Sequence, residues 1–214
     1  MRSFSHTDSK QIPLDFKLNE LINKENGFFI ELGAYNGIDQ SNTAFFEFYK
    51  NWTGILIEPS YDEYIKCVNN RKNSIVLNCA SVSNDYNNEF IEGDFNNGPM
   101  SSINGSRVNG KIITKIKART LESILDEYSN NKGIDLLSLD VEGYELNVLK
   151  GLNLKKYRPT YLLIEIYNNQ YIDICNFLFE NQYKLHSNFT NYNNIDNPIW
   201  DGTHNDYLFI SINN

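Results

Sequence analysis

The chain alternates short apolar runs with segments in which apolar residues recur at every third or fourth position. Apolar runs of a few residues are typical of buried strands, and the longer spacing is typical of amphipathic helices. The runs predict strands at 28–31, 55–57, 74–82, 134–141, 161–167, 183–185 and 207–212. Helical spacing predicts helices at 13–24, 44–49, 61–70, 121–128, 145–150 and 172–181. Strands that alternate with helices and end in a hairpin predict an α/β fold, in which a doubly wound, mostly parallel seven-stranded sheet contains one antiparallel strand.

The pattern shows no interdomain linker and no internal repeat, so we expect one domain over residues 1–214. Its first segment, 1–26, contributes one helix. A polar stretch rich in Asn and Gly, 84–110, predicts a hairpin or a loop excursion. Apolar and basic residues alternate over 112–117, which is typical of an edge strand.

The most informative stretch is Gly27–Pro59, in which each of two predicted strands ends on an acid, Glu31 and Glu58. Glycines 33 and 37 between strand and helix allow positive φ and a close approach to a ligand. Nucleotide-binding α/β units hold ribose hydroxyls with an acid about 20 residues past such a turn, and Glu58 fits that spacing. The dinucleotide fingerprint needs a third glycine, and Glu31 would repel a pyrophosphate. The unit therefore predicts a nucleoside-containing ligand, with an ordinary strand–helix–strand crossover as the alternative.

Further acids follow the later strands. The run 134–141 delivers Asp140 and Glu142 to its carboxyl end, where open α/β sheets bind their ligands. Two acids on a buried strand end need a functional reason. Glu165 lies inside the next predicted strand, and His204 precedes the last one. Glu145 also suits the first turn of a helix, where its charge stabilises the helix dipole.

The composition excludes some classes of protein. A net charge of −8, a pI of about 4.9 and a mean hydropathy of −0.48 describe a soluble acidic chain. Phosphate contacts dominate nucleic-acid affinity, so no nucleic-acid partner is expected. Three scattered cysteines predict reduced thiols rather than disulfides or a zinc site. The sequence has neither a signal-peptide pattern nor an apolar run long enough to span a membrane, which predicts a cytoplasmic protein.

Several motifs occur in a fixed order along residues 28 to 170: Glu31-Leu-Gly-Ala-Tyr-Asn-Gly37, Ser41-Asn-Thr43, Trp52-Thr-Gly54, Ile57-Glu-Pro59, Asp140-Val-Glu-Gly-Tyr-Glu145, Leu149-Lys-Gly151, Arg158-Pro159 and Ile164-Glu165. In this combination the chain resembles the FkbM family of S-adenosylmethionine-dependent methyltransferases. The resemblance implies a Rossmann-like class I methyltransferase fold and an O-methyltransferase that acts on a hydroxyl, often of a sugar. The expected partner is thus a saccharide, a glycan or another hydroxyl-bearing small molecule.

The resemblance also implies roles for individual residues. The turn would cradle the amino-acid end of S-adenosylmethionine, Glu58 would bind its ribose, and the next strand its adenine. The full set of expected cofactor contacts is Glu31, Gly33, Ala34, Asn36, Gly37, Ser41, Asn42, Thr43, Glu58, Cys79, Ala80 and Asp140.

A sugar hydroxyl is a weak acid, so transfer to it calls for a general base or a divalent metal. The candidate catalytic residues are Asp140, Glu142, Glu165 and His204. Alternatively, Asp140 and a second carboxylate can hold a magnesium ion through oxygen ligands. Two other functions stay open: a nucleotide-binding oxidoreductase of similar topology, and a non-catalytic module that keeps the fold.

Overall fold

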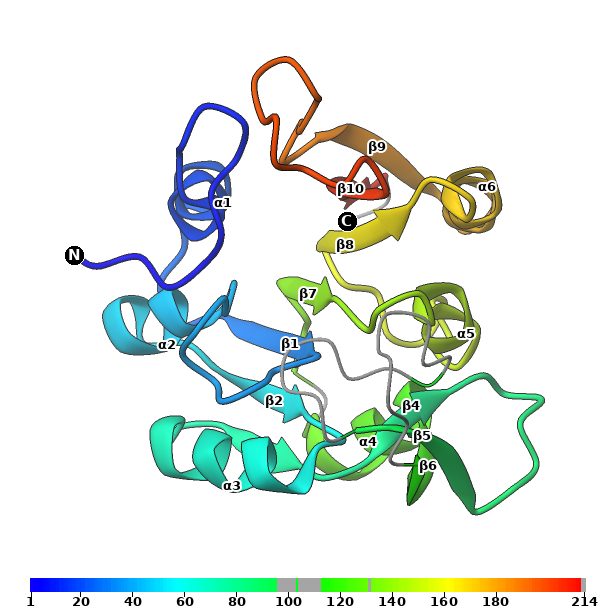
Figure 1. The fold of residues 1–214 in the computed structure, drawn as a ribbon. Helices are drawn as coiled ribbons and strands as arrows, with labels where there is room; N and C mark the ends of the chain where they lie inside the picture. Colours follow the sequence, from blue (N-terminus) through cyan, green and yellow to red (C-terminus); the bar gives the residue numbers. More distant parts are fainter. Residues whose placement is uncertain (96–102, 104–112, 131, 213–214) are drawn as a thin grey trace.

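A computed structural model describes residues 1–95, 103, 113–130 and 132–212 of the chain. At its centre lies a seven-stranded sheet with the order β3-β2-β1-β7-β8-β10-β9 (Figure 1). Its strands are β1 (Phe28–Leu32), β2 (Thr53–Ile57), β3 (Ile75–Leu77), β7 (Leu136–Leu139), β8 (Tyr161–Tyr167), β9 (Tyr183–Asn188) and β10 (His204–Ser211).

Strand β10 is the one antiparallel member of this sheet. It runs antiparallel to both β8 and β9, whereas β3, β2, β1, β7 and β8 pair in parallel. The order reverses between β1 and β7, because β1 pairs with β2 on one side and with β7 on the other. This confirms the predicted mostly parallel seven-stranded sheet and puts the topological switch point, where such folds bind ligands, beside β1.

Helices cover both faces of the sheet: α1 (Leu14–Ile22), α2 (Ala44–Lys50) and α3 (Tyr61–Asn70) on one, α4 (Leu121–Tyr128), α5 (Glu145–Lys150) and α6 (Tyr171–Glu180) on the other. In Figure 1, α1, α2 and α3 lie on the left, and α5 and α6 on the right. Successive residues of a strand point to opposite faces, so β1 packs Phe29 against the first set of helices and Ile30 against the second.

A small second sheet differs from the sequence expectation. The predicted strand 74–82 is divided into β3 and β4 (Ala80–Val82), and β4 joins β5 (Phe90–Asp94) and β6 (Ile113–Thr120) in the order β4-β6-β5. The chain leaves the large sheet at Asn78, whose side-chain amide donates to the carbonyls of Glu58 and Pro59. The segment predicted as an edge strand therefore forms the middle of this sheet, and its alternation reflects one solvent-exposed face.

Within 84–110, where the sequence predicts a hairpin or a loop excursion, the structure has β5, and its antiparallel partner β6 follows that stretch. Residues 96–102 and 104–110 of that excursion lie outside the described residues. The three cysteines are buried and free of disulfides. None of the helices in the described part of the chain is both long and apolar enough to cross a lipid bilayer.

Candidate active site

A cavity opens at the carboxyl ends of β1, β2 and β7. The parallel register aligns Leu32 with Ile57 on one side and with Leu139 on the other, so the loops that follow these strands meet at one edge of the sheet. The cavity is lined by Leu32, Gly33, Ala34, Tyr35, Asp39, Gln40, Ser41, Ile57, Glu58, Pro59, Cys79, Ala80, Ser81, Phe95, Ile103, Asp140, Val141, Glu142 and Tyr144. Many of the residues predicted for the site are thus brought together here.

Gly33 lets the loop after β1 pass directly against the end of β7. Its φ is +75°, and a Cβ at this position would lie 1.8 Å from the backbone oxygen of Asp140. Tyr35, two residues further on, also has a positive φ of +48°. Its backbone N–H donates to Oε2 of Glu58 at 2.7 Å. The turn predicted from the glycines therefore connects the two acidic walls of the cavity, Glu58 and Asp140.

We expect Gly33→Ala to lower the free energy of unfolding by about 2–5 kcal/mol. Positive φ accounts for about 1–2 kcal/mol, and the overlap with Asp140 adds roughly 1–3 kcal/mol. Gly202→Ala is the matched control, because Gly202 has φ +78° but nothing within 4 Å of an added Cβ. Urea unfolding measures both variants, and an equal loss in the two would contradict the close approach at Gly33.

Glu58 is buried in the wall of the cavity and kept in place by the backbone. Its Oε1 accepts the N–H of Ser60 at 2.7 Å and its Oε2 accepts that of Tyr35. Burial raises the pKa of Glu58 to about 7, against the lowering effect of these two hydrogen bonds. A carboxylate has about four acceptor positions, so acceptor capacity remains for hydroxyl donors of a ligand.

The adjacent wall is formed by Cys79, Ala80 and Ser81, all buried. Burial raises the pKa of the Cys79 thiol to about 11, so this side chain stays neutral and apolar at pH 7. A flat apolar ring would fit against such a wall better than a charged group. The location agrees with the strand end at which the sequence predicts the adenine.

Glu31 lies apart from the cavity, although the sequence predicts direct contact with the cofactor. Its buried carboxylate accepts hydrogen bonds from Ser41 Oγ at 2.9 Å, Thr43 Oγ1 at 2.6 Å and the backbone N–H of Asn42 at 2.9 Å. A guanidinium nitrogen of buried Arg71 lies 3.4 Å from its Oε2. Glu31 therefore holds the loop before α2 in position, and of these hydroxyl and amide donors only Ser41 reaches the cavity lining.

Other predicted contacts also belong to the support of the loop. Asn36 accepts the backbone N–H groups of Ile38 and Asp39 at 2.9 Å. Gly37, with φ +78°, packs against Arg71 and Cys67, where a Cβ would meet their side chains at 2.8 Å. Like Asn42 and Thr43, both lie outside the cavity lining. Capping of α2 comes from Ser41, whose Oγ accepts from Ala44 N at 3.0 Å.

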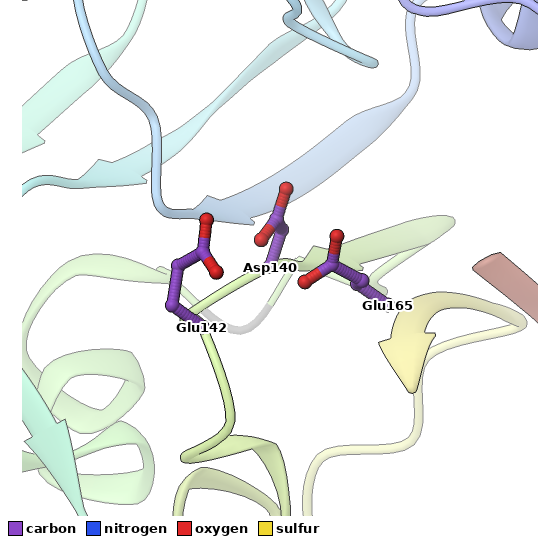
Figure 2. A group of neighbouring side chains, drawn as sticks. All are labelled: Asp140, Glu142 and Glu165. Atoms are coloured by element: carbon purple, nitrogen blue, oxygen red, sulfur yellow. The ribbon is translucent and has the colours of Figure 1, made fainter. Parts of the chain in front are cut away.

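Asp140 and Glu142, which line the cavity, lie close to the carboxylate of Glu165, which is outside its lining; Figure 2 shows the three acids together. Asp140 and Glu142 follow β7, and Glu165 projects from β8; one oxygen of each lies within 4.8 Å of the others. Burial, and then Glu142 and Asp206, raise the pKa of Asp140 well above its usual range. Burial, and then Asp140, do the same for the pKa of Glu165. The cluster thus concentrates negative charge, or shared protons, at one point.

Neighbouring side chains orient these acids. Nε2 of His204 lies 3.2 Å from Oε1 of Glu165, so the predicted histidine joins the cluster. The hydroxyl of Tyr167 donates to Oε2 of Glu142 at 2.6 Å. Glu145 has a structural role. It is fully buried, and its Oε1 accepts hydrogen bonds from the backbone N–H groups of Val141 and Gly143. Glu145 thereby fixes the turn that carries Glu142, which itself has a φ of +54°.

Sequence reasoning missed several residues of this site, among them Tyr144, Ser81 and Arg71. Tyr144 lines the cavity next to the acids, and Ser81 adds a buried hydroxyl to the wall at Cys79. Arg71 supports the loop from 34 to 43 through contacts with Gly37, Ser41 and Thr43, up to 34 residues away in the sequence. The available signal for Arg71 was indirect, because Glu31 and Glu47 are acids in otherwise apolar segments and a buried acid requires a donor.

Solved structures with a similar fold are methyltransferases of low sequence identity. A TehB-like SAM-dependent methyltransferase from Corynebacterium glutamicum has a TM-score of 0.50 and 6% identity, with 92% of this chain and 87% of that chain covered. A SAM-dependent methyltransferase from Clostridium acetobutylicum has a TM-score of 0.49 and 10% identity, with 92% and 89% covered. Fibrillarin from Aeropyrum pernix, solved with bound S-adenosyl-L-methionine, has a TM-score of 0.49 and 13% identity, with 87% and 67% covered.

The sheet topology and its switch-point cavity define the class: this is the fold of class I SAM-dependent methyltransferases. The model of one protein family, described as "Methyltransferase FkbM domain", matches residues 31–185, which is more than half of the chain. The chain therefore belongs to the FkbM methyltransferase family. A search of the curated proteins finds no match.

Proposed function

We propose that the protein binds S-adenosylmethionine in the cavity and transfers its methyl group to a hydroxyl of a saccharide or a similar small acceptor. The single observation that carries this proposal is that one cavity joins Glu58, on the side of β2, to the acids Asp140 and Glu142 that follow β7. If the nucleoside of S-adenosylmethionine is bound beside Glu58, the sulfonium of the cofactor would extend toward Asp140 and Glu142.

The cofactor contacts follow from the lining of the cavity. Glu58 would accept hydrogen bonds from the two ribose hydroxyls, and the wall at Cys79 would take the adenine. The backbone at Gly33 and Ala34, together with Ser41, would border the amino-acid end, and Asp140 would accept from its ammonium group. Methyl transfer is an in-line displacement, so holding the cofactor on three sides would supply most of the catalysis through alignment.

The acids support a hydroxyl acceptor. In the reaction a bond forms between the acceptor oxygen and the methyl carbon, the bond from that carbon to sulfur breaks, and the hydroxyl proton passes to a base. Burial raises the pKa of Glu165 well above its usual range, which makes its carboxylate a stronger base, and His204 lies 3.2 Å from it. Neighbouring carboxylates also accept hydrogen bonds from adjacent sugar hydroxyls.

Transfer of a labelled methyl group tests the proposal. The full-length protein is incubated with S-[methyl-³H]adenosylmethionine and a panel of saccharides, glycosylated small molecules, amines and RNA. We expect label in a base-stable ether on a saccharide or small hydroxylated acceptor and none on RNA. Transfer to amines or RNA alone would contradict the proposed acceptor. Cofactor binding without transfer to any acceptor would instead favour the non-catalytic alternative.

The affinity for the cofactor should depend on pH through Glu58. The carboxylate accepts hydrogen bonds from ribose more strongly than the neutral acid does, and the pKa of Glu58 is about 7 in the folded chain. Affinity should therefore rise as the pH increases through 7, by about tenfold between pH 6 and pH 8, and then level off. Calorimetric titration measures this rise. Glu58→Gln should bind more weakly and lose it, and an unchanged pH profile in that variant would assign the titration to another group.

A further inference from the structure

We propose that Asp140, Glu142 and Glu165 form a divalent-cation site at the edge of the cavity, where Asp140 and Glu142 line it. The three acids come from the loop after β7 and from β8, and Figure 2 shows their carboxylates pointing toward one another. One oxygen from each lies within 4.8 Å of the others. Oxygens on one Mg²⁺ lie about 2.9 Å apart when adjacent and about 4.2 Å when opposite, as bond lengths of about 2.1 Å require. Small rotamer changes would bring the three into that range.

An unsatisfied oxygen in the cluster points independently to a ligand. Glu165 is 9% exposed, its Oε1 lies next to His204, and its Oε2 is buried without a hydrogen-bond donor among the described residues. Asp140 is the neighbouring acid, and two carboxyl groups such as those of Asp140 and Glu165 can share a hydrogen bond only if one of them is protonated. Buried polar atoms in native proteins are almost always satisfied. A cation would satisfy this one without a proton.

The surroundings of the acids also resemble those of a metal site. Carboxylates that ligate metals are themselves held by hydrogen bonds from a second layer of side chains. His204 contacts the other oxygen of Glu165, Oε1, at 3.2 Å, and Tyr167 donates to Glu142 at 2.6 Å. The rings of His204 and Tyr167 pack against each other at 5.3 Å between centroids. Two of the three carboxylates are thus oriented by one aromatic pair.

The three carboxylate ligands favour some metal ions over others. Carboxylate oxygens alone favour Mg²⁺, Mn²⁺ or Ca²⁺ over Zn²⁺ or copper, which prefer nitrogen and sulfur. Asp206 adds a further negative charge near Asp140 and Glu165. In the catalytic setting, which rests on the proposed function, a bound cation would orient two adjacent acceptor hydroxyls and make one more acidic. Glu165 would then serve as a ligand, and His204 beside it would take the proton.

Binding of Mn²⁺, followed by electron paramagnetic resonance of the free ion, tests the site in the full-length, EDTA-treated protein. We expect saturable binding of one Mn²⁺ per chain, with competition by Mg²⁺ or Ca²⁺. Glu165→Gln should weaken it at least about tenfold, and Tyr167→Phe, which leaves all three ligands in place, by about 10- to 100-fold. Glu180→Gln, at the exposed end of α6, is the matched control and should bind like the wild type. Circular dichroism checks that each variant is folded.

Two results would overturn the inference: no saturable Mn²⁺ binding by the wild type, or equal binding by folded Glu165→Gln. In either case the acids would suit a cationic acceptor instead. Calorimetry with S-adenosylmethionine in EDTA separates this inference from the proposed function. If the protein binds the cofactor but not Mn²⁺, the metal site is wrong and the proposed function stands. If it binds Mn²⁺ but not the cofactor, the proposed function is wrong and the metal site stands.

Discussion

Arg71→Met is expected to lower the free energy of unfolding by about 3–5 kcal/mol, because it leaves two buried carboxylates without their cation. The Arg71 side chain is fully buried, and its Nε lies 2.9 Å from Oε2 of Glu47, which is also fully buried. A second nitrogen lies 3.4 Å from Glu31. The guanidinium also donates to the carbonyl of Gly37 at 3.0 Å and to the hydroxyl of Thr43 at 2.9 Å.

Urea unfolding of Arg71→Met is compared with that of Arg119→Met, the matched control. Arg119 pairs with Glu127 at 2.8 Å, but the Glu127 side chain is 53% exposed, so this variant should lose at most about 1 kcal/mol. Adding Glu31→Gln and Glu47→Gln to Arg71→Met should recover part of the loss, since no unpaired buried charge then remains. Equal losses for Arg71→Met and Arg119→Met would show that the buried cluster does not hold the loop.

Local patterns predicted most of the fold. The helix 61–70 and the strand 161–167 agree with α3 and β8 residue for residue, because each is a periodic or continuous apolar segment with polar ends. The antiparallel strand followed from the closing hairpin. The pattern of apolar and polar residues did not predict the separate sheet β4-β6-β5. That sheet depends on pairing between segments more than 30 residues apart, as in Ala80 with Ala118.

The site was predictable where chemistry lies at strand ends and less so where it depends on side-chain direction. Glu58 and Asp140 both line one cavity, because parallel strands bring their carboxyl ends to one edge. Glu31 lies on the same edge, yet its side chain faces Ser41 and Thr43. Only the fold shows that Arg71, 40 residues further on, completes its surroundings. The contact of Glu165 with His204 likewise follows from the register of β8 with β10.

Glu58→Ala is expected to weaken the binding of S-adenosylmethionine by about 100-fold or more. Hydrogen bonds to a charged group contribute about 1.5–3 kcal/mol each, and one carboxylate would receive two ribose hydroxyls. The loss of both corresponds to at least about 3 kcal/mol, or about two orders of magnitude in Kd. The two backbone N–H groups of Tyr35 and Ser60 would lose their acceptor as well, which loosens the turn around the ligand.

The most direct test of the account is calorimetric titration of the cofactor into Glu58→Ala at pH 8.5, where the wild-type carboxylate is ionised. Glu63→Ala is the matched control, because Glu63 is a buried acid of the neighbouring helix α3 that lies outside the cavity lining. The account predicts wild-type affinity for Glu63→Ala and a loss of about 100-fold for Glu58→Ala. Wild-type affinity in a folded Glu58→Ala chain would contradict it.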